Sequence, residues 1–240
     1  GELVQVVCGA SNIAQGQKVP FAQVGAAFPD FKIKKAKLRG VESFGMVCSS
    51  VEIGIAEESS GILVLPADAP IGKRVDDYLK LKDNVLDISI TPNRGDCISV
   101  LGIAREVAAL NDTKCMTPEN PVVQDSAKDV LPVTVSAPEK CPRYLCRVIK
   151  NVNTKAQTPL WMKEMLRRSG VASISPVVDV TNYVMLELGQ PMHAFDLAKV
   201  DGELVVRNSR KGEVVELLSQ QNITLDDDTL VIADAKQTLA

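Results

Sequence analysis

The chain has 240 residues, of which 45% are hydrophobic and 24% are charged, and its formal net charge at pH 7 is −3. This length and composition favour a folded protein of about two or three domains and exclude a largely disordered chain. The net negative charge excludes a chain that attracts nucleic acid over its whole surface. No run approaches the roughly 20 apolar residues of a membrane span, and no basic leader precedes an apolar core, so we expect a cytoplasmic protein.

The cysteines and the histidine argue against a zinc site. Cysteines occupy positions 8, 48, 97, 115, 141 and 146 without any CxxC pair, and there is one histidine. That set lacks the ligand spacing of a structural zinc site, so we expect no metal and reduced thiols that are mainly buried. Aromatic residues make up 4% of the chain, which leaves few platforms on which RNA bases could stack.

Residues 1–82 alternate short apolar runs with Gly and Pro turns, which predicts a small all-β barrel. Within them, Ala36 and Leu38 alternate with basic residues, as in a half-buried strand with a basic outer face. The basic group comprises Lys32, Lys34, Lys35, Lys37 and Arg39. Such a face can contact phosphates, but it is equally consistent with a solubilising surface or an edge strand guarded by lysines.

Residues 83–130 predict a strand, a helix and a linker. Residues 87–90 form the strand, which ends in a Pro-Asn turn, and residues 99–111 form an amphipathic helix. The apolar side of this helix comprises Ile103, Val107 and Leu110. The turn carries side chains suited to a capping network, namely Asn93, Arg94 and Asp96. Residues 117–130 are polar with two prolines, as at a domain boundary.

Residues 131–240 predict a mixed α+β unit. Residues 133–135 and 144–149 predict two strands, and residues 158–170 a helix with Pro159 in its first turn and Gly170 after its end. The basic residues of this helix are Lys163, Arg167 and Arg168, for which a solvated face is the commoner role, and Trp161 is expected in the core. After residue 202 we expect three short strands, with residues 229–234 central. The acidic run 226–228 predicts a solvated turn rather than a cation site.

The stretch VVDVTNYVMLELGQPMHAFD, residues 177–196, gathers the chain's only histidine, a Thr-Asn pair and a Gly-Gln-Pro turn. VVDV predicts a short buried strand, TNY its end, VMLEL a helix and GQP the stop of that helix. On this prediction Thr181, Asn182 and His193 can face a common hollow and recognise a polar ligand. A plainer interpretation makes Thr181 or Asn182 a helix cap and His193 a partly buried structural residue.

This stretch resembles the editing module of bacterial phenylalanyl-tRNA synthetase beta subunits. Further motifs of the same family follow in the same order, namely KIKKAKLRGVES from residue 32, LPADAPIG from residue 65, ITPNRGDCISVLGIAREVAAL from residue 90, CPRY from residue 141 and TPLWMKEMLRRSG from residue 158. The resemblance covers essentially the whole chain. Because the family's subunits extend beyond both ends, we expect an internal fragment.

The resemblance implies a multidomain α+β fold: a partial OB-fold β-barrel, a small α/β linker domain and the start of a mixed α+β editing module. Residues 1–82 would be the OB-fold tRNA-binding domain without its first strands, residues 83–130 the small strand–helix domain and linker, and residues 131–240 the start of a B3/B4-type editing domain. The family's pocket continues beyond Ala240, and Ala172 stands where the family often has arginine. We therefore expect this fragment alone to be inactive.

The resemblance also implies a function. The family's beta subunit hydrolyses tyrosine mischarged on tRNA-Phe, while the alpha subunit of the α2β2 heterotetramer performs aminoacylation with ATP and Mg²⁺. By resemblance, Thr181, Asn182 and His193 are editing-pocket residues, and the basic group at residues 32–39 binds tRNA. Hydrolysis of an activated ester needs an oriented water and oxyanion stabilisation, so no strong nucleophile and no cofactor are expected in this fragment. The alternative is a non-catalytic RNA-binding or assembly module.

Overall fold

The computed structural model describes residues 2–117, 119–217 and 220–240. The chain divides into two compact units. Unit 1 comprises Gly1–Pro92 and Thr158–Ser173, and unit 2 comprises Asn93–Gln157 and Ile174–Ala240. Among the described residues, no helix has both the length and the apolar character needed to cross a membrane.

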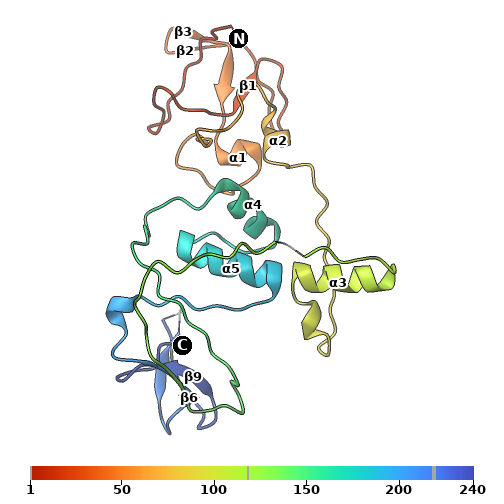
Figure 1. Ribbon diagram of the computed structural model, residues 1–240. Helices are drawn as coiled ribbons and strands as arrows, with labels where there is room; N and C mark the ends of the chain where they lie inside the picture. Colours follow the sequence, from red (N-terminus) through yellow and green to blue (C-terminus); the bar gives the residue numbers. More distant parts are fainter. Residues whose placement is uncertain (1, 118, 218–219) are drawn as a thin grey trace. The chain divides into compact units, whose positions relative to one another are not determined.

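Unit 1 is built from short antiparallel strand pairs and short helices (Figure 1). Its strands are β1 (Phe21–Gln23), β2 (Ala36–Leu38), β3 (Val41–Ser43) and β4 (Gly45–Val47), and its helices are α1 (Ser50–Ile53), α2 (Val75–Tyr78) and α4 (Leu160–Arg168). β1 pairs with β4 and β2 with β3 as separate two-stranded sheets. The expected closed barrel is therefore not confirmed in the described residues, because three-residue pairs and single bridges replace a continuous ladder.

Two small apolar clusters form the core of unit 1. Ala22, Ile33 and Cys48 make up the first cluster. Ile55, Leu63 and Leu79 make up the second, against which Leu160 of α4 also packs. The helix α4 is therefore part of the same core as residues that precede it by about a hundred positions, which the sequence pattern did not predict.

The α4 helix agrees with its prediction in extent but not in the roles of its side chains. Met162 and Leu166 are buried, whereas Trp161 is 54% exposed, so the expectation of a core tryptophan is wrong. Arg168 is 11% exposed and donates hydrogen bonds to the carbonyl oxygens of Leu79 and Lys80. A solvated face is therefore wrong for Arg168, because its guanidinium binds backbone carbonyl oxygens and Asp83 instead of facing solvent.

Unit 2 contains a three-stranded sheet, a hairpin and two longer helices (Figure 1). The elements are η1 (Gly95–Cys97), α3 (Val100–Leu110), β5 (Val133–Val135), α5 (Pro176–Leu188), η2 (Leu197–Lys199), β6 (Leu204–Asn208), β7 (Val214–Glu216), β8 (Asn222–Thr224) and β9 (Leu230–Ala233). β6 lies between β5, which is parallel to it, and β9, which is antiparallel. β7 and β8 form the hairpin. The sheet buries Leu204 and Val206 of β6 and Val231 and Ala233 of β9.

Several of the remaining strand predictions, one in unit 1 and the others in unit 2, are wrong. Residues 87–90 and 144–149 form no strand, although the first run alternates polar and apolar residues and the second is largely apolar. Among the described residues after 202 there are four strands instead of three, and β6 rather than β9 is the middle strand of the sheet. Short apolar runs do not reveal whether a pairing partner lies beside them, which explains these errors. The run 226–228 is an exposed turn, as expected.

The largest correction concerns the stretch VVDVTNYV, which is helical and not a strand. α5 runs without a break from Pro176 to Leu188, with the Ser175 side chain accepting a hydrogen bond from the Val178 N–H and Gly189 ending the helix in the left-handed region. A Ser cap followed by Pro is a strong helix start. That start signal outweighs the β-branched run, and Thr181 and Asn182 therefore lie mid-helix and cap nothing.

The α3 helix is confirmed, but its buried side is not the expected one. Gly102 and Ala108 are its buried residues, whereas Val107 is 52% and Leu110 77% exposed. α3 contacts α5 within unit 2. The expectation of mainly buried cysteines is also wrong, because only Cys48 and Cys97 are buried among the free thiols.

Candidate functional site

The basic residues of unit 1 are presented by the hairpin that β2 and β3 form. Arg39 and Gly40 make its two-residue turn, with φ of +50° and +84°. Positive φ at both positions is the requirement of a type I′ turn, whose twist matches that of the flanking strands. The register pairs Lys37 with Glu42, so Lys35 and Lys37 lie on the same face of the hairpin as Glu42.

All five basic residues of this group are exposed. The expectation of a half-buried strand is wrong, because Leu38 is 46% and Val41 47% exposed on the other face of the hairpin. The Lys35 ammonium lies 2.8 Å from a Glu42 carboxylate oxygen and 4.7 Å from the centre of the Phe44 ring. Among the described residues, the remaining four cations, Lys32, Lys34, Lys37 and Arg39, form no ion pair, so their charges are available to a ligand.

The three residues expected to form a pocket in unit 2 lie on different elements. The Thr181 hydroxyl donates to the carbonyl oxygen of Val178 at 2.9 Å, one turn earlier in α5, and Asn182 is partly exposed beside it. His193 is exposed on the irregular segment between α5 and η2, where its ring stacks on Phe195 at a centroid distance of 5.9 Å. In the described part of the chain no hydrogen bond joins His193 to Thr181 or Asn182.

A hollow of about 390 Å³ lies in unit 1, and none of these three residues lines it. Its lining comprises Asp76, Asp77, Lys80, Lys82, Asp83, Met165 and Arg168. Asp76 already accepts hydrogen bonds from Arg74, and Arg168 pairs with Asp83 at 2.9 Å. The ionic groups of this hollow therefore largely satisfy one another, and we assign no ligand to it.

Sequence reasoning missed Asp179, the fully buried carboxylate of the VVDVTNYV stretch. Asp179 accepts a hydrogen bond at 2.8 Å from the backbone N–H of Ile174, which precedes the helix cap. A carboxylate in this place anchors the entry of the chain into α5 and interacts favourably with the positive end of the helix. The Ser-Pro pair at 175–176 is the signal that could have placed the helix start, and with it this residue.

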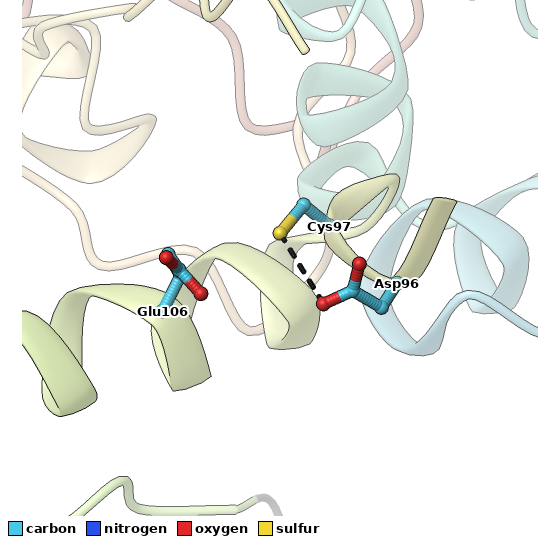
Figure 2. Close-up of side chains that lie close together, drawn as sticks. All are labelled: Asp96, Cys97 and Glu106. Atoms are coloured by element: carbon cyan, nitrogen blue, oxygen red, sulfur yellow. Dashed lines mark hydrogen bonds between the residues drawn. The ribbon is translucent and has the colours of Figure 1, made fainter. Parts of the chain in front are cut away.

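Asp96, Cys97 and Glu106 lie within 4.8 Å of one another, close enough to hold a metal ion (Figure 2). Arg94 reaches all three, with one guanidinium nitrogen 3.0 Å from an Asp96 oxygen, 3.0 Å from the Cys97 sulfur and 2.5 Å from a Glu106 oxygen. Hydrogen bonds from Arg94 lower the pKa of Glu106 and of Asp96, whereas burial raises the pKa of the Cys97 thiol. A guanidinium thus supplies the cation that the cluster needs.

The network around Arg94 agrees in part with the capping network expected at this turn. Arg94 and Asp96 belong to it, but the cap of α3 is Ser99, whose hydroxyl accepts from the Gly102 N–H at 2.9 Å. Glu106, which lies in the middle of α3, completes the network by accepting hydrogen bonds from Arg94. The turn between η1 and α3 brings Glu106 back toward Arg94, which explains why spacing along the sequence did not reveal it.

Comparisons with protein families define the class of this chain. Residues 1–74 match the model of a putative tRNA binding domain, and residues 140–240 match that of the B3/4 domain. The first match contains the basic hairpin, and the second contains Thr181, Asn182 and His193. Together they define a chain that combines a domain of the tRNA-binding type with a domain of the B3/4 type.

Individual relatives identify the family. The chain is 56% identical over 239 residues to the phenylalanine–tRNA ligase beta subunit of Dickeya dadantii, covering 99% of the chain and 30% of that protein. It is 58% identical to the beta subunit of Pseudomonas putida and 59% to that of Hahella chejuensis, each over 240 residues, 100% of the chain and 30% of the relative. These 240 residues therefore belong to the phenylalanine–tRNA ligase beta-subunit family, and they span about 30% of the length of these relatives.

Proposed function

We propose that these residues supply tRNA binding and hydrolytic proofreading to a cytoplasmic phenylalanine–tRNA ligase. An alpha subunit, in an α2β2 assembly, would carry aminoacylation with ATP and Mg²⁺. The observation that supports this proposal most strongly is the occurrence of a putative tRNA binding domain and a B3/4 domain in one chain that is 56–59% identical to ligase beta subunits.

The basic hairpin of β2 and β3 supports the tRNA-binding part of the proposal. Lys32, Lys34, Lys37 and Arg39 are exposed and form no ion pair within the described residues. Cations of this kind release condensed counterions when they meet a phosphate backbone, which favours binding and makes it depend on salt. A chain with a net charge of −3 can therefore still bind tRNA through one local surface.

Replacing Lys34 and Lys37 together with glutamine tests this surface. We expect the slope of log affinity for tRNA against log salt concentration to fall in magnitude by about 1.5, because two phosphate contacts are lost. The measurement is a binding titration of the complete protein at several salt concentrations. Lys211→Gln, an exposed lysine of unit 2, is the matched control and should leave the slope unchanged. Equal slopes for all three proteins would refute binding through this hairpin.

The residues of α5 and the segment after it support the proofreading part. An editing site gains specificity for tyrosine by hydrogen bonding its hydroxyl, because a buried polar group left unpaired disfavours phenylalanine. His193 is exposed and can meet a substrate, and the oxygen of Thr181 keeps acceptor capacity beyond its bond to Val178. In this proposal His193 orients the ester, the terminal adenosine or a water, while Thr181 and Asn182 hydrogen bond substrate or water.

A second candidate function is RNA binding or subunit assembly without catalysis. It is favoured by the exposure of His193 and by the lack of a hydrogen bond, among the described residues, between His193 and Thr181 or Asn182. The two functions differ in one measurable property. Proofreading requires hydrolysis of mischarged tRNA that is sensitive to His193, whereas a binding module retains its RNA affinity when His193 is replaced.

A further inference from the structure

Phe44 adds an exposed aromatic ring to the basic face of the β2–β3 hairpin. Ala36 pairs with Ser43, so the next step of the register places Lys35 opposite Phe44. The Lys35 ammonium accordingly lies 4.7 Å from the centre of the Phe44 ring, and the ring side chain is 36% exposed. An aromatic ring among exposed cations is the combination that proteins use to hold single-stranded nucleic acid.

The backbone on both sides of Phe44 is firmly held. The Phe44 N–H donates to the carbonyl oxygen of Gln5 at 2.9 Å. The neighbouring Ser43 is buried, and its hydroxyl accepts from the Val7 N–H at 3.0 Å and donates to the Gly45 carbonyl oxygen at 3.1 Å. Phe44 therefore projects from a fixed position, so little conformational entropy is lost when a ligand stacks on its ring.

Other phenylalanines of unit 1 have protein partners of a different kind. Phe28 and Phe31 stack on each other with centroids 4.8 Å apart. The Phe21 ring occupies the space beside Gly45, where a Cβ atom would lie 2.3 Å from it. By contrast, the contact on Phe44 is a lysine whose side chain is itself 53% exposed. Such a cation–π contact is weak at an exposed site, so a ligand can displace the ammonium at small cost.

Glu42 lies on the same face of the hairpin and lowers its positive charge. Its carboxylate lies 2.8 Å from the Lys35 ammonium, and the register places it directly opposite Lys37. The carboxylate thus neutralises part of the positive charge beside the ring and would repel an approaching phosphate. Removing the Glu42 charge should therefore raise the affinity for RNA, whereas removing a lysine should lower it.

We propose that Phe44 is a stacking platform for an unpaired RNA base, with Lys35 and Lys37 contacting the phosphates on either side of that base. The inference rests on the proposed tRNA-binding function and adds that the part of the RNA bound here is single-stranded. A base within a duplex has both faces covered by its neighbours, so it cannot stack on a protein ring. The site therefore selects loops or ends of a folded RNA.

Binding of a fluorescently labelled oligouridylate and of a labelled RNA duplex to the complete protein tests the proposal. Phe44→Leu should weaken oligouridylate binding about tenfold without changing its salt dependence, because stacking involves no counterion release. Lys37→Gln should reduce the magnitude of the salt slope by about 0.7. Glu42→Gln should tighten binding. Phe31→Leu, at an exposed phenylalanine that already stacks on Phe28, is the control and should bind like the native protein.

Phe44→Trp separates stacking from a mere effect on folding, because it keeps a planar ring. This variant should retain native affinity, and its added indole fluorescence should be quenched by oligouridylate. Loss of binding in Phe44→Leu together with retention in Phe44→Trp supports the platform. Native affinity of Phe44→Leu would overturn the inference, and so would an equal loss of duplex binding.

Failure of this inference is distinguishable from failure of the proposed function. If Phe44→Leu binds normally while the lysine variants weaken binding and lower the salt slope, the platform is wrong and tRNA binding by the hairpin stands. If neither the lysines nor Phe44 affect binding to tRNA or to oligouridylate, the binding surface itself is wrong and the inference falls with it.

Discussion

Glu213→Ala is expected to lower the free energy of unfolding by about 3 kcal/mol, because it leaves the partly buried Arg207 without its partner. The Glu213 carboxylate accepts hydrogen bonds from both terminal nitrogens of Arg207, at 2.7 and 2.8 Å, and both side chains are about 15% exposed. It also accepts from the Arg210 N–H at 2.7 Å and from the Thr238 hydroxyl at 2.5 Å. One carboxylate thus connects β6 with the segments that precede β7 and follow β9.

Glu216→Ala is the matched control for this substitution. Glu216 is an exposed glutamate at the end of β7, only three positions away, and its replacement should change stability by less than about 0.5 kcal/mol. Denaturant unfolding of the two variants and the native protein provides the comparison. Equal midpoints for Glu213→Ala and Glu216→Ala would contradict the structural role assigned to Glu213.

The stabilisation by Glu213 should also depend on pH. The hydrogen bonds from Arg207 hold the pKa of Glu213 well below its usual range. A carboxylate whose pKa is lower in the folded state stabilises the fold above the pKa of the unfolded chain, about 4.3, and the contribution is lost as pH falls toward the folded pKa. The stability difference between the native protein and Glu213→Gln should therefore be constant near neutral pH and shrink below about pH 4.

Gly102→Ala is expected to destabilise unit 2 by about 1–3 kcal/mol, although alanine ordinarily stabilises a helix relative to glycine by about 1 kcal/mol. A Cβ atom at position 102 would lie 2.1 Å from the Asp96 carbonyl oxygen and 3.0 Å from the Cys97 Cα. Both are backbone atoms, so they cannot move aside as a flexible side chain can. The clash would separate α3 from η1 and disturb the contacts of Arg94.

Gly95→Ala is the control for Gly102→Ala, because a Cβ atom at position 95 meets nothing within 4 Å. Thermal unfolding of the two variants should show a clear loss only for Gly102→Ala. A stabilised Gly102→Ala protein would mean that α3 and η1 do not approach each other as closely as described.

The course of the chain from residue 175 to 193 shows which helix signals were decisive. VMLEL was predicted to be helical and Gly189 to stop the helix, and both are confirmed by α5. VVDV was predicted as a strand because a short apolar run suits a buried strand, a preference that valine itself shares. The Ser-Pro start at 175–176 overrode that preference, and it turned a predicted pair of elements into one helix.

For the basic hairpin, the secondary structure was predicted correctly but the burial of its side chains was not. Its strand was predicted correctly from the alternation of residues 35–39, but alternation does not reveal whether the apolar face has anything to pack against. Leu38 and Val41 remain exposed, so the burial prediction was wrong while the strand prediction was right. The role of Phe44 was likewise hidden, because a low aromatic content of the whole chain says nothing about where a single ring lies.

Charged side chains were the least predictable part. Arg168 was expected on a solvated face, yet it donates to carbonyl oxygens of residues 79 and 80, which lie 89 and 88 positions away in the sequence. Arg94 joins Asp96, Cys97 and Glu106 through a turn whose geometry the sequence does not display. The partners of long charged side chains depend on tertiary packing, and local patterns contain no information about it.

Hydrolysis of tRNA-Phe mischarged with tyrosine is the measurement that tests the proposed function most directly. It should be made on the complete protein together with the proposed alpha subunit, comparing the native protein, His193→Ala and the control Gln190→Ala from the same exposed segment. We predict that His193→Ala lowers the rate of hydrolysis by about 100-fold, with aminoacylation intact and Gln190→Ala unaffected. Unchanged hydrolysis by His193→Ala would contradict the proofreading site and leave an RNA-binding module.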